Sequence, residues 1–112
     1  MKKISTVIEV AEKTLHAKDS IQKSYRAGYN SIEGFLVLSQ KRLLFMQRHG
    51  FYRSQYHIIV DVPYKKINSL TVEASHRFAL EVPGKIHQFT TFSAVTAAIV
   101  KQNLEDFMAL VS

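Results

Sequence analysis

The chain has 112 residues and no cysteine, and its 15 lysines and arginines outnumber its 9 acidic residues, giving a formal net charge of +6. This length fits one domain with a modest core, and the lack of cysteine excludes disulfides and thiolate chemistry. No apolar run approaches the roughly 20 residues of a membrane span, and Glu9 and Glu12 interrupt the stretch where a signal peptide would be apolar. We expect a cytoplasmic protein, either free or peripheral at a membrane.

Near the N-terminus, apolar residues recur at helical spacing: Ile4, Val7, Ile8, Ala11 and Leu15. They predict an amphipathic helix over residues 4–16, an addition to the rest of the single domain, which spans residues 1–112. Its polar face contains two glutamates, whereas helices that lie on membrane surfaces usually have a basic polar face. Packing on the domain or on a second subunit is therefore favoured over membrane contact.

Four β-strands are predicted in the first half of the chain, over residues 19–29, 34–38, 43–46 and 56–62. The polar break Ser39–Arg42 separates the second strand from the third and is typical of a hairpin turn. In the fourth strand, alternation places Ile58 and Val60 on the same face. Pro63 ends this strand because proline cannot donate a hydrogen bond to a neighbouring strand.

Three further strands are predicted over residues 69–74, 77–82 and 85–92. The second of these has the cleanest alternation in the chain, with Phe78, Leu80 and Val82 on one face. Pro83–Gly84 predicts a tight turn into the last strand, in which we expect Ile86 to lie opposite Leu80.

From residue 94 to the end the pattern becomes helical, and Ser93 is the expected N-cap. This helix, residues 93–111 with its cap, has a continuous apolar stripe with Met108 beside it: Ala97, Val100, Leu104, Phe107 and Val111. A sheet with one apolar face needs a cover, and this helix has the broad apolar face to supply it. The sequence therefore predicts a mainly β domain, with strands over 20–92 and a capping helix.

Two segments, GFLVLSQKRLLF from Gly34 and VPYKKINSL from Val62, together resemble the prokaryotic pleckstrin-homology-like domains, close to the GRAM group. The positions that carry the resemblance are Gly34, Leu36, Lys41, Arg42, Leu43, Phe45, Pro63, Tyr64 and Ile67. The resemblance covers roughly residues 20 to 111. It implies a mainly β (α+β) fold: a seven-stranded, partly open antiparallel barrel of two nearly orthogonal sheets, capped by the C-terminal helix. It also implies a binding module.

No catalytic or metal-binding constellation is recognisable in the sequence. The five histidines have no metal-ligand spacing: His16, His49, His57, His76 and His87. Nothing suggests that Asp61 and Glu81, both on predicted strands, act as a paired acid and base. We therefore predict a protein that is not an enzyme and has no metal and no cofactor. The two histidines within strands, His57 and His87, are expected to be structural or solvated.

The candidate binding site is the loop 47–55, which places three potential cations around two aromatic residues: Arg48, His49 and Arg53 around Phe51 and Tyr52. Cations can hold lipid phosphates while aromatic rings enter the membrane interface. Lys85, after the Pro83–Gly84 turn, is expected to approach this loop. The alternative is that the two aromatic residues pack inward or on another chain.

The resemblance implies that this loop lies at the open end of the barrel, where eukaryotic relatives bind phosphoinositide head groups. Those relatives carry several basic residues after the first strand, whereas residues 28–33 of this chain are polar and slightly acidic. A general contact with anionic surfaces is therefore favoured over recognition of a specific inositol phosphate. The leading hypothesis for function remains protein–protein contact or self-association as a homo-oligomer; anionic membrane binding is the alternative. Nucleic acid is less favoured because basic and aromatic residues do not interleave on one strand face.

Overall fold

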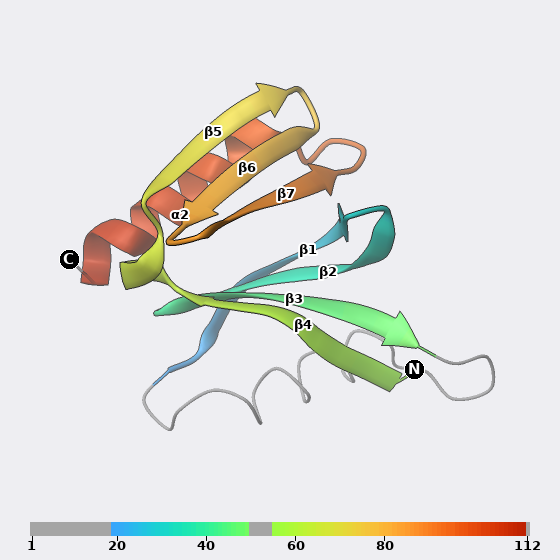
Figure 1. The fold of residues 1–112 in the computed structure, drawn as a ribbon, viewed down its shortest axis with the longest axis horizontal. Coiled ribbons are helices and arrows are strands. Elements are labelled where there is room, and N and C mark those ends of the chain that lie inside the picture. Colours follow the sequence, from blue (N-terminus) through green and yellow to red (C-terminus); the bar gives the residue numbers. More distant parts are fainter. Residues whose placement is uncertain (1–18, 50–54, 112) are drawn as a thin grey trace.

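The computed structural model describes residues 19–49 and 55–111. Its elements in chain order are β1 (Ile21–Tyr29), β2 (Ile32–Ser39), β3 (Arg42–His49), β4 (Gln55–Pro63), the 3-10 turn η1 (Tyr64–Lys66), β5 (Ser69–Ala74), β6 (Arg77–Val82), β7 (Lys85–Thr91) and α2 (Ala97–Val111) (Figure 1). The predicted order of seven strands followed by a helix is confirmed. The predicted helix over residues 4–16 and residues 50–54 of the candidate loop lie outside the described residues.

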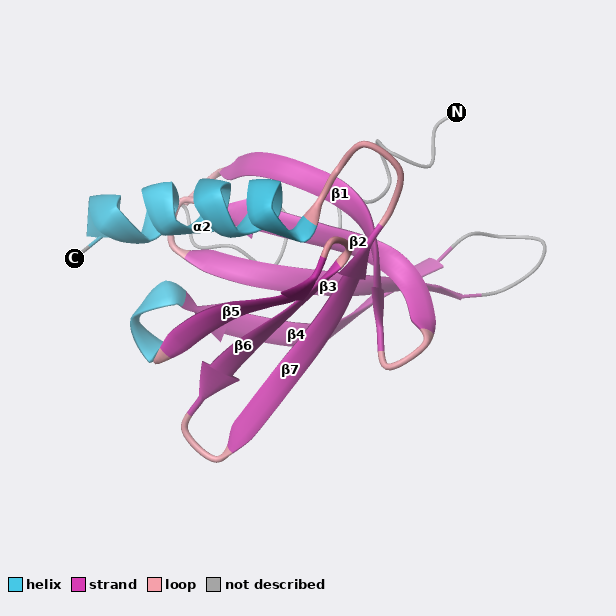
Figure 2. Ribbon diagram, turned by 90° about the horizontal axis from the view of Figure 1, so that it is seen from above, coloured by secondary structure: helices cyan, strands magenta, loops and turns pink. Residues whose placement is uncertain are grey.

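The seven strands form one antiparallel sheet in the order β4-β3-β2-β1-β7-β6-β5. β1 and β7 pair only through Ala27–Tyr29 and Phe89–Thr91, and the two halves of the sheet diverge from this short seam (Figure 1). α2 packs on β5, β6 and η1 and so covers one side of the bent sheet (Figure 2). The expected partly open, helix-capped barrel is confirmed, and its two halves belong to one continuous sheet.

The interior of the barrel is an apolar core shared by the sheet and α2. Three phenylalanines are its largest fully buried side chains, Phe45, Phe78 and Phe89, and the last two rings stack with their centroids 5.4 Å apart. The predicted stripe of α2 faces this core, with Ala97, Val100 and Leu104 buried and Phe107, Met108 and Val111 packed at its margin. The stripe is therefore confirmed as the covering surface.

A second apolar cluster, the outer cluster, lies on the opposite face of β2, β3 and β4. It consists of Val37, Leu44, Met46 and Tyr56, with Ile21, Phe35 and Ile58 packed against them. A β-bulge in β4 separates the two faces, because Phe45 pairs with Val60 but the next residue, Met46, pairs with Ile58. Val60 therefore lies in the main core and Ile58 beside the outer cluster. The prediction that these two share a face is wrong, since the extra residue shifts the alternation.

The register of the β6–β7 hairpin also differs from the prediction. A two-residue turn pairs Val82 with Lys85, which places His87 opposite Leu80 and Ile86 opposite Glu81. His87 is buried, whereas Ile86 is 61% exposed. The expectation that Ile86 faces Leu80 is wrong by one position, and a shift of one residue turns every side chain of a strand to the other face.

The helix begins three residues later than the sequence indicated. Ser93 has a positive φ of 57° and precedes an irregular segment. The cap is Thr96, whose Oγ1 accepts a hydrogen bond from the Ile99 amide at 3.4 Å while its carbonyl accepts one from Val100 at 3.2 Å. The assignment of Ser93 as the N-cap is therefore wrong.

Candidate functional site

The predicted loop site is only partly within the described residues. Arg48 and His49 end β3, where they pair with Tyr56 and Gln55. Phe51, Tyr52 and Arg53 lie outside the described residues, so the role predicted for this loop stays a prediction.

The structure places Lys85 away from the ends of this loop. Lys85 begins β7 beside the Pro83–Gly84 turn, and Pro83 lines a shallow hollow together with Pro63 at the C-terminal end of β4. The 47–55 loop enters β4 at its N-terminal end instead. Nine residues of strand, roughly 25 Å, separate the two ends. The structure therefore does not bring Lys85 together with Arg48 and His49.

At the other end of β3, the Ser39–Arg42 turn is organised around one buried hydroxyl, that of Ser39. Ser39 Oγ accepts hydrogen bonds from the amides of Lys41 at 3.2 Å and Arg42 at 3.0 Å, and it donates to Asp19 Oδ2 at 2.9 Å. Asp19 Oδ1 in turn accepts a hydrogen bond from the Gln40 amide at 2.9 Å. One serine and one aspartate thus fix the backbone of the turn and hold the chain entering β1 against it.

Tyr64, the first residue of η1, ties the same turn to the end of β4. Its amide donates to the Lys41 carbonyl at 2.9 Å, and its hydroxyl donates to the Ser39 carbonyl. Burial raises the pKa of Tyr64, and the negative charge of Asp19 raises it further. The phenol therefore keeps its proton and remains a donor at any physiological pH. The Pro-Tyr segment that contributed to the resemblance thus has a structural reason: it locks η1 onto the β2–β3 turn.

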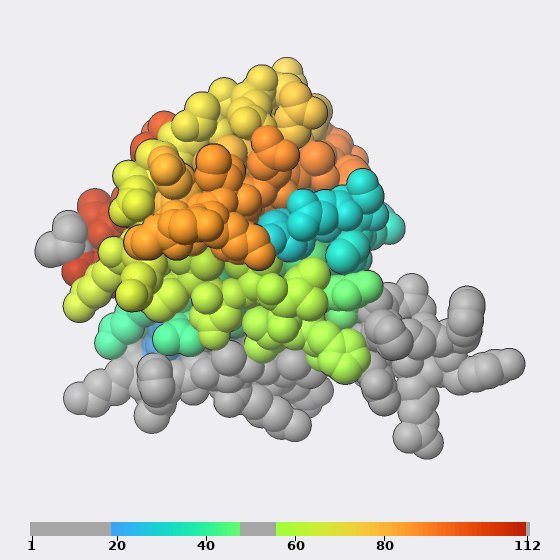
Figure 3. All heavy atoms as spheres, viewed as in Figure 1, coloured from blue at the N-terminus to red at the C-terminus, as the bar shows by residue number. Residues whose placement is uncertain are grey.

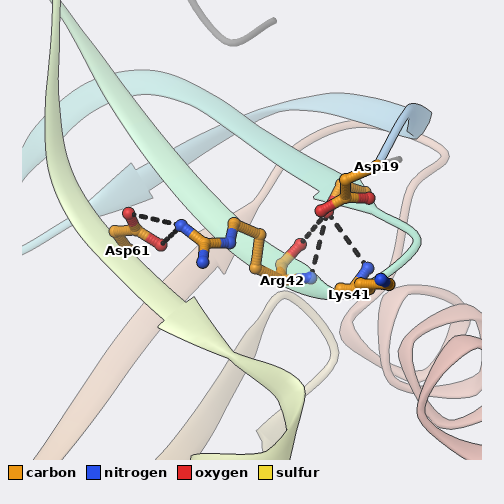
Figure 4. A network of polar contacts seen from close by, with 5 residues as sticks. Asp19, Lys41, Arg42 and Asp61 are labelled. Carbon is orange, nitrogen blue, oxygen red and sulfur yellow. Dashed lines mark hydrogen bonds and ion pairs between the residues drawn. The ribbon is translucent and has the colours of Figure 1, made fainter. Parts of the chain in front are cut away.

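The cations around this turn differ in their partners. Arg42 forms a two-point ion pair with Asp61, with Nη1 3.1 Å from Oδ1 and 3.0 Å from Oδ2 (Figure 4). Lys41 and Lys65 are exposed and form no ion pair with any of the residues that the structure describes. Positive charge at this end of the barrel is therefore only partly neutralised.

Two hollows adjoin the turn, and the end of α2 forms part of both. One, of about 400 Å³, is lined by Lys41, Arg42, Pro63, Lys65, Leu110 and Val111. The other, of about 270 Å³, is lined by Gln22, Gln40, Lys41, Phe107, Leu110 and Val111. Leu110 is 81% exposed, more than any other large apolar side chain among the described residues. We call the surface formed by Lys41, Lys65, Leu110 and Val111 the basic end.

Sequence reasoning missed the basic end as a site. In the sequence, Lys41 and Arg42 indicate a hairpin turn and contribute to the family resemblance, and Lys65 lies in the second segment of that resemblance; neither pattern indicates a binding role. Leu110 carried a usable signal, because it is a large apolar residue outside the predicted stripe of α2. What the sequence could not show is that the end of α2 reaches the β2–β3 turn and η1.

A buried polar pair lies in the wall of the barrel. Tyr29 Oη and His87 Nδ1 are 2.8 Å apart, and the rings of both residues lie near Phe89. Burial lowers the pKa of His87, and the nearby charge of Lys85 lowers it further. A neutral imidazole inside the wall fits the structural role expected for this histidine. Among the described residues, no three histidine or acidic side chains gather as they would to hold a metal ion.

The described residues contain no helix long and apolar enough to span a membrane.

No curated protein matches the sequence. The chain is similar in structure to the C-terminal domain of an unknown protein from Leishmania infantum, with a TM-score of 0.72 at 13% identity over 96% of this chain and 99% of that one. The chain is also similar in structure to a DUF1696 family protein with a pleckstrin-homology domain from Shewanella loihica. The TM-score is 0.61 at 16% identity, over 96% of this chain and 99% of that one. A pleckstrin homology domain from Shewanella amazonensis also matches, with a TM-score of 0.61 at 17% identity and 96% and 99% coverage.

These likenesses agree with the fold built above: seven antiparallel strands in one open sheet and a C-terminal helix. The sequence of residues 8–112, nearly the whole chain, matches the family model described as "Bacterial PH domain". The resemblance inferred from the β2–β3 hairpin and the Pro-Tyr segment is thereby confirmed, and the chain belongs to the bacterial PH domain family.

Proposed function

We propose that this domain is a non-catalytic binding module that works through protein contacts, including contacts with copies of itself. The observation that carries the proposal is the open sheet, whose edge strands β4 and β5 each pair with only one other described strand. Each edge also exposes a large apolar side chain, Ile59 at 38% and Val72 at 40%. A strand with a neighbouring strand on only one side can pair with a strand of another chain, and exposed apolar side chains add affinity.

Light scattering at micromolar concentration tests self-association. The unaltered protein should have the mass of an oligomer, and Ile59→Lys or Val72→Lys should shift it towards the monomer, because a lysine on an edge opposes strand pairing. Ile86→Lys is the matched control, since Ile86 is more exposed but lies on β7, inside the sheet. A monomeric unaltered protein would remove self-association from the proposal.

A second candidate function is peripheral binding to anionic membranes through the 47–55 loop. The net charge of +6 supports it, as does the grouping of Arg48 and Arg53 with Phe51 and Tyr52 in the sequence. Sedimentation with acidic and with neutral vesicles, at low and moderate salt, should show salt-sensitive binding to acidic vesicles only. Arg48→Glu combined with Arg53→Glu should abolish it; unchanged sedimentation of this variant would exclude the loop.

A further inference from the structure

We propose that the basic end binds an acidic segment of a different protein, one that also carries a large apolar side chain. The inference rests on the proposed function, since it names the chemistry of one partner of the binding module. It concerns a surface beside the start of β3 and the end of β4, at the opposite end of these strands from His49 and Gln55. Three features of the surface support it: its charge, its shape and its rigidity.

The charge of the surface selects the partner. Lys41 and Lys65 border the same hollow, and neither is neutralised by a described residue. Next to them, Lys66 is exposed as well. A second copy of this chain also carries a net charge of +6, so two basic ends facing each other would repel. Carboxylates of another protein would be attracted, and they would be steered towards this end during encounter.

The shape of the surface favours a protein segment over a flat lipid surface. Leu110 stands between two hollows of about 400 and 270 Å³, and both also include Lys41 and Val111. A segment that crosses Leu110 can place side chains in both hollows and cover an apolar residue that the core does not use. A flat head-group layer has no side chains to place in the two hollows.

The surface is also preorganised, which reduces the entropic cost of binding. The backbone that carries Lys41 is held by Ser39 Oγ, and that of η1 is held through Tyr64. α2 contacts η1 as well as the sheet. The three elements that form the basic end are thus tied to one another before any partner arrives.

The test is a fluorescence anisotropy titration of the full chain with a labelled twelve-residue probe peptide of alternating glutamate and leucine. Two comparison peptides separate the contributions: in one serine replaces every leucine, and in the other lysine replaces every glutamate. The acidic, leucine-containing probe should bind most tightly, the serine peptide more weakly, and the lysine peptide not at all. Lack of binding by the first probe would overturn the inference.

Variants locate the binding. Lys41→Glu with Lys65→Glu should weaken probe binding by about tenfold or more, and Leu110→Ser by about fivefold, because each removes one kind of contact. Lys85→Glu and Ile86→Ser are matched controls: an exposed lysine and an exposed apolar residue at the start of β7. They should bind as the unaltered protein does, and thermal melts should show that all four proteins fold. Equal losses in the controls would contradict the inference.

Two outcomes separate this inference from the alternatives. A monomeric protein that still binds the probe at the basic end would disprove self-association while the inference stands. The other outcome is that the protein binds acidic vesicles but not the probe peptide, and that the Lys41, Lys65 and Leu110 variants lose the vesicle binding. The basic end would then be a membrane-binding surface, and the peptide inference would be wrong.

Discussion

At the scale of single residues, Ser39 shows how one small polar side chain determines the local structure of a basic turn. It is fully buried, and its hydroxyl accepts hydrogen bonds from two backbone amides and donates one to a carboxylate. A buried donor left without a partner costs more than an ordinary hydrogen bond contributes, because its solvation is lost. The positions of Lys41 and of η1 therefore depend on a residue that itself has no contact with solvent.

We predict that Ser39→Ala lowers the free energy of unfolding by about 2 kcal/mol, since two amides and Asp19 lose a common partner. Urea denaturation measures this difference. Ser69→Ala is the matched control, because Ser69 is exposed and donates a single hydrogen bond to Glu81 Oε1 at 3.1 Å. It should stay within about 0.5 kcal/mol of the unaltered protein. Equal effects of the two substitutions would show that the turn does not depend on this hydroxyl.

The buried pair of His87 and Tyr29 predicts a dependence of stability on pH. The pKa of His87 is lowered in the folded protein, whereas a histidine in the unfolded chain has a pKa of about 6.5. As pH falls from about 6.5 towards the lower folded pKa, the unfolded chain binds a proton that folded His87 does not, so stability falls. Above about 6.5 both forms are neutral and this contribution disappears.

Urea denaturation of the unaltered protein and of His87→Gln, at several values between pH 5 and 8, measures this contribution. The variant should lose part of the decrease in stability below pH 6.5, since its side chain does not titrate. His76→Gln, in which an exposed histidine is replaced, should keep the decrease. A His87→Gln profile parallel to that of the unaltered protein would contradict the prediction.

At the scale of elements, the sequence predicted the number, order and type of the strands well, because alternation and turn residues are local properties. It failed where one residue changes a register. The bulge in β4 separates Ile58 from Val60, and the Pro83–Gly84 turn sets His87, not Ile86, opposite Leu80. The bulge is not visible in composition or periodicity, because it depends on pairing with β3, whereas the register of the β6–β7 hairpin follows from the length of its two-residue turn.

The same limit explains the start of α2 and the candidate site. Ser93 and Thr96 are both suitable caps by residue type, and only the backbone conformation distinguishes them. The basic end is formed by residues 41, 65, 110 and 111, which are brought together by packing of α2 on η1. A family resemblance predicts such packing in outline, but it does not indicate which exposed side chains meet.

We predict that Thr96→Ala lowers the free energy of unfolding by about 1 kcal/mol, because the Ile99 amide loses its hydrogen-bond acceptor, Thr96 Oγ1. Ser93→Ala is the matched comparison, since Ser93 lies before the helix and shows no cap bond. Its effect should be smaller than that of Thr96→Ala in the same urea titration. A larger loss of unfolding free energy for Ser93→Ala would contradict this prediction and support Ser93 as the N-cap.

At the scale of the whole molecule, the notable feature is a sheet that is apolar on both faces over β2, β3 and β4. The main core and α2 account for one face. Figure 3 shows that the residues of β5–β7 lie directly above those of β4 in that view. On the opposite face, Val37, Leu44 and Met46 of the outer cluster have no exposed surface, although they point away from the barrel interior. An apolar face of this size needs a cover.

The predicted amphipathic stripe of residues 4–16 is a suitable cover, and its removal is the corresponding test. We predict that deletion of residues 1–16 lowers the free energy of unfolding by roughly 3 kcal/mol or more, because several large apolar side chains lose their buried contacts. It should also increase binding of a hydrophobic dye. Glu9→Ser in the full chain is the control, since it alters only the predicted polar face.

Light scattering of the deletion variant then distinguishes the two packing modes that the sequence left open. If the segment packs on its own domain, stability falls and the mass is unchanged; if it packs on a second subunit, the mass falls as well, and the loss of stability depends on protein concentration. Unchanged stability, dye binding and mass would contradict both. The outer cluster would then have to be covered by other parts of the chain, and self-association, if present, would depend on the edges β4 and β5.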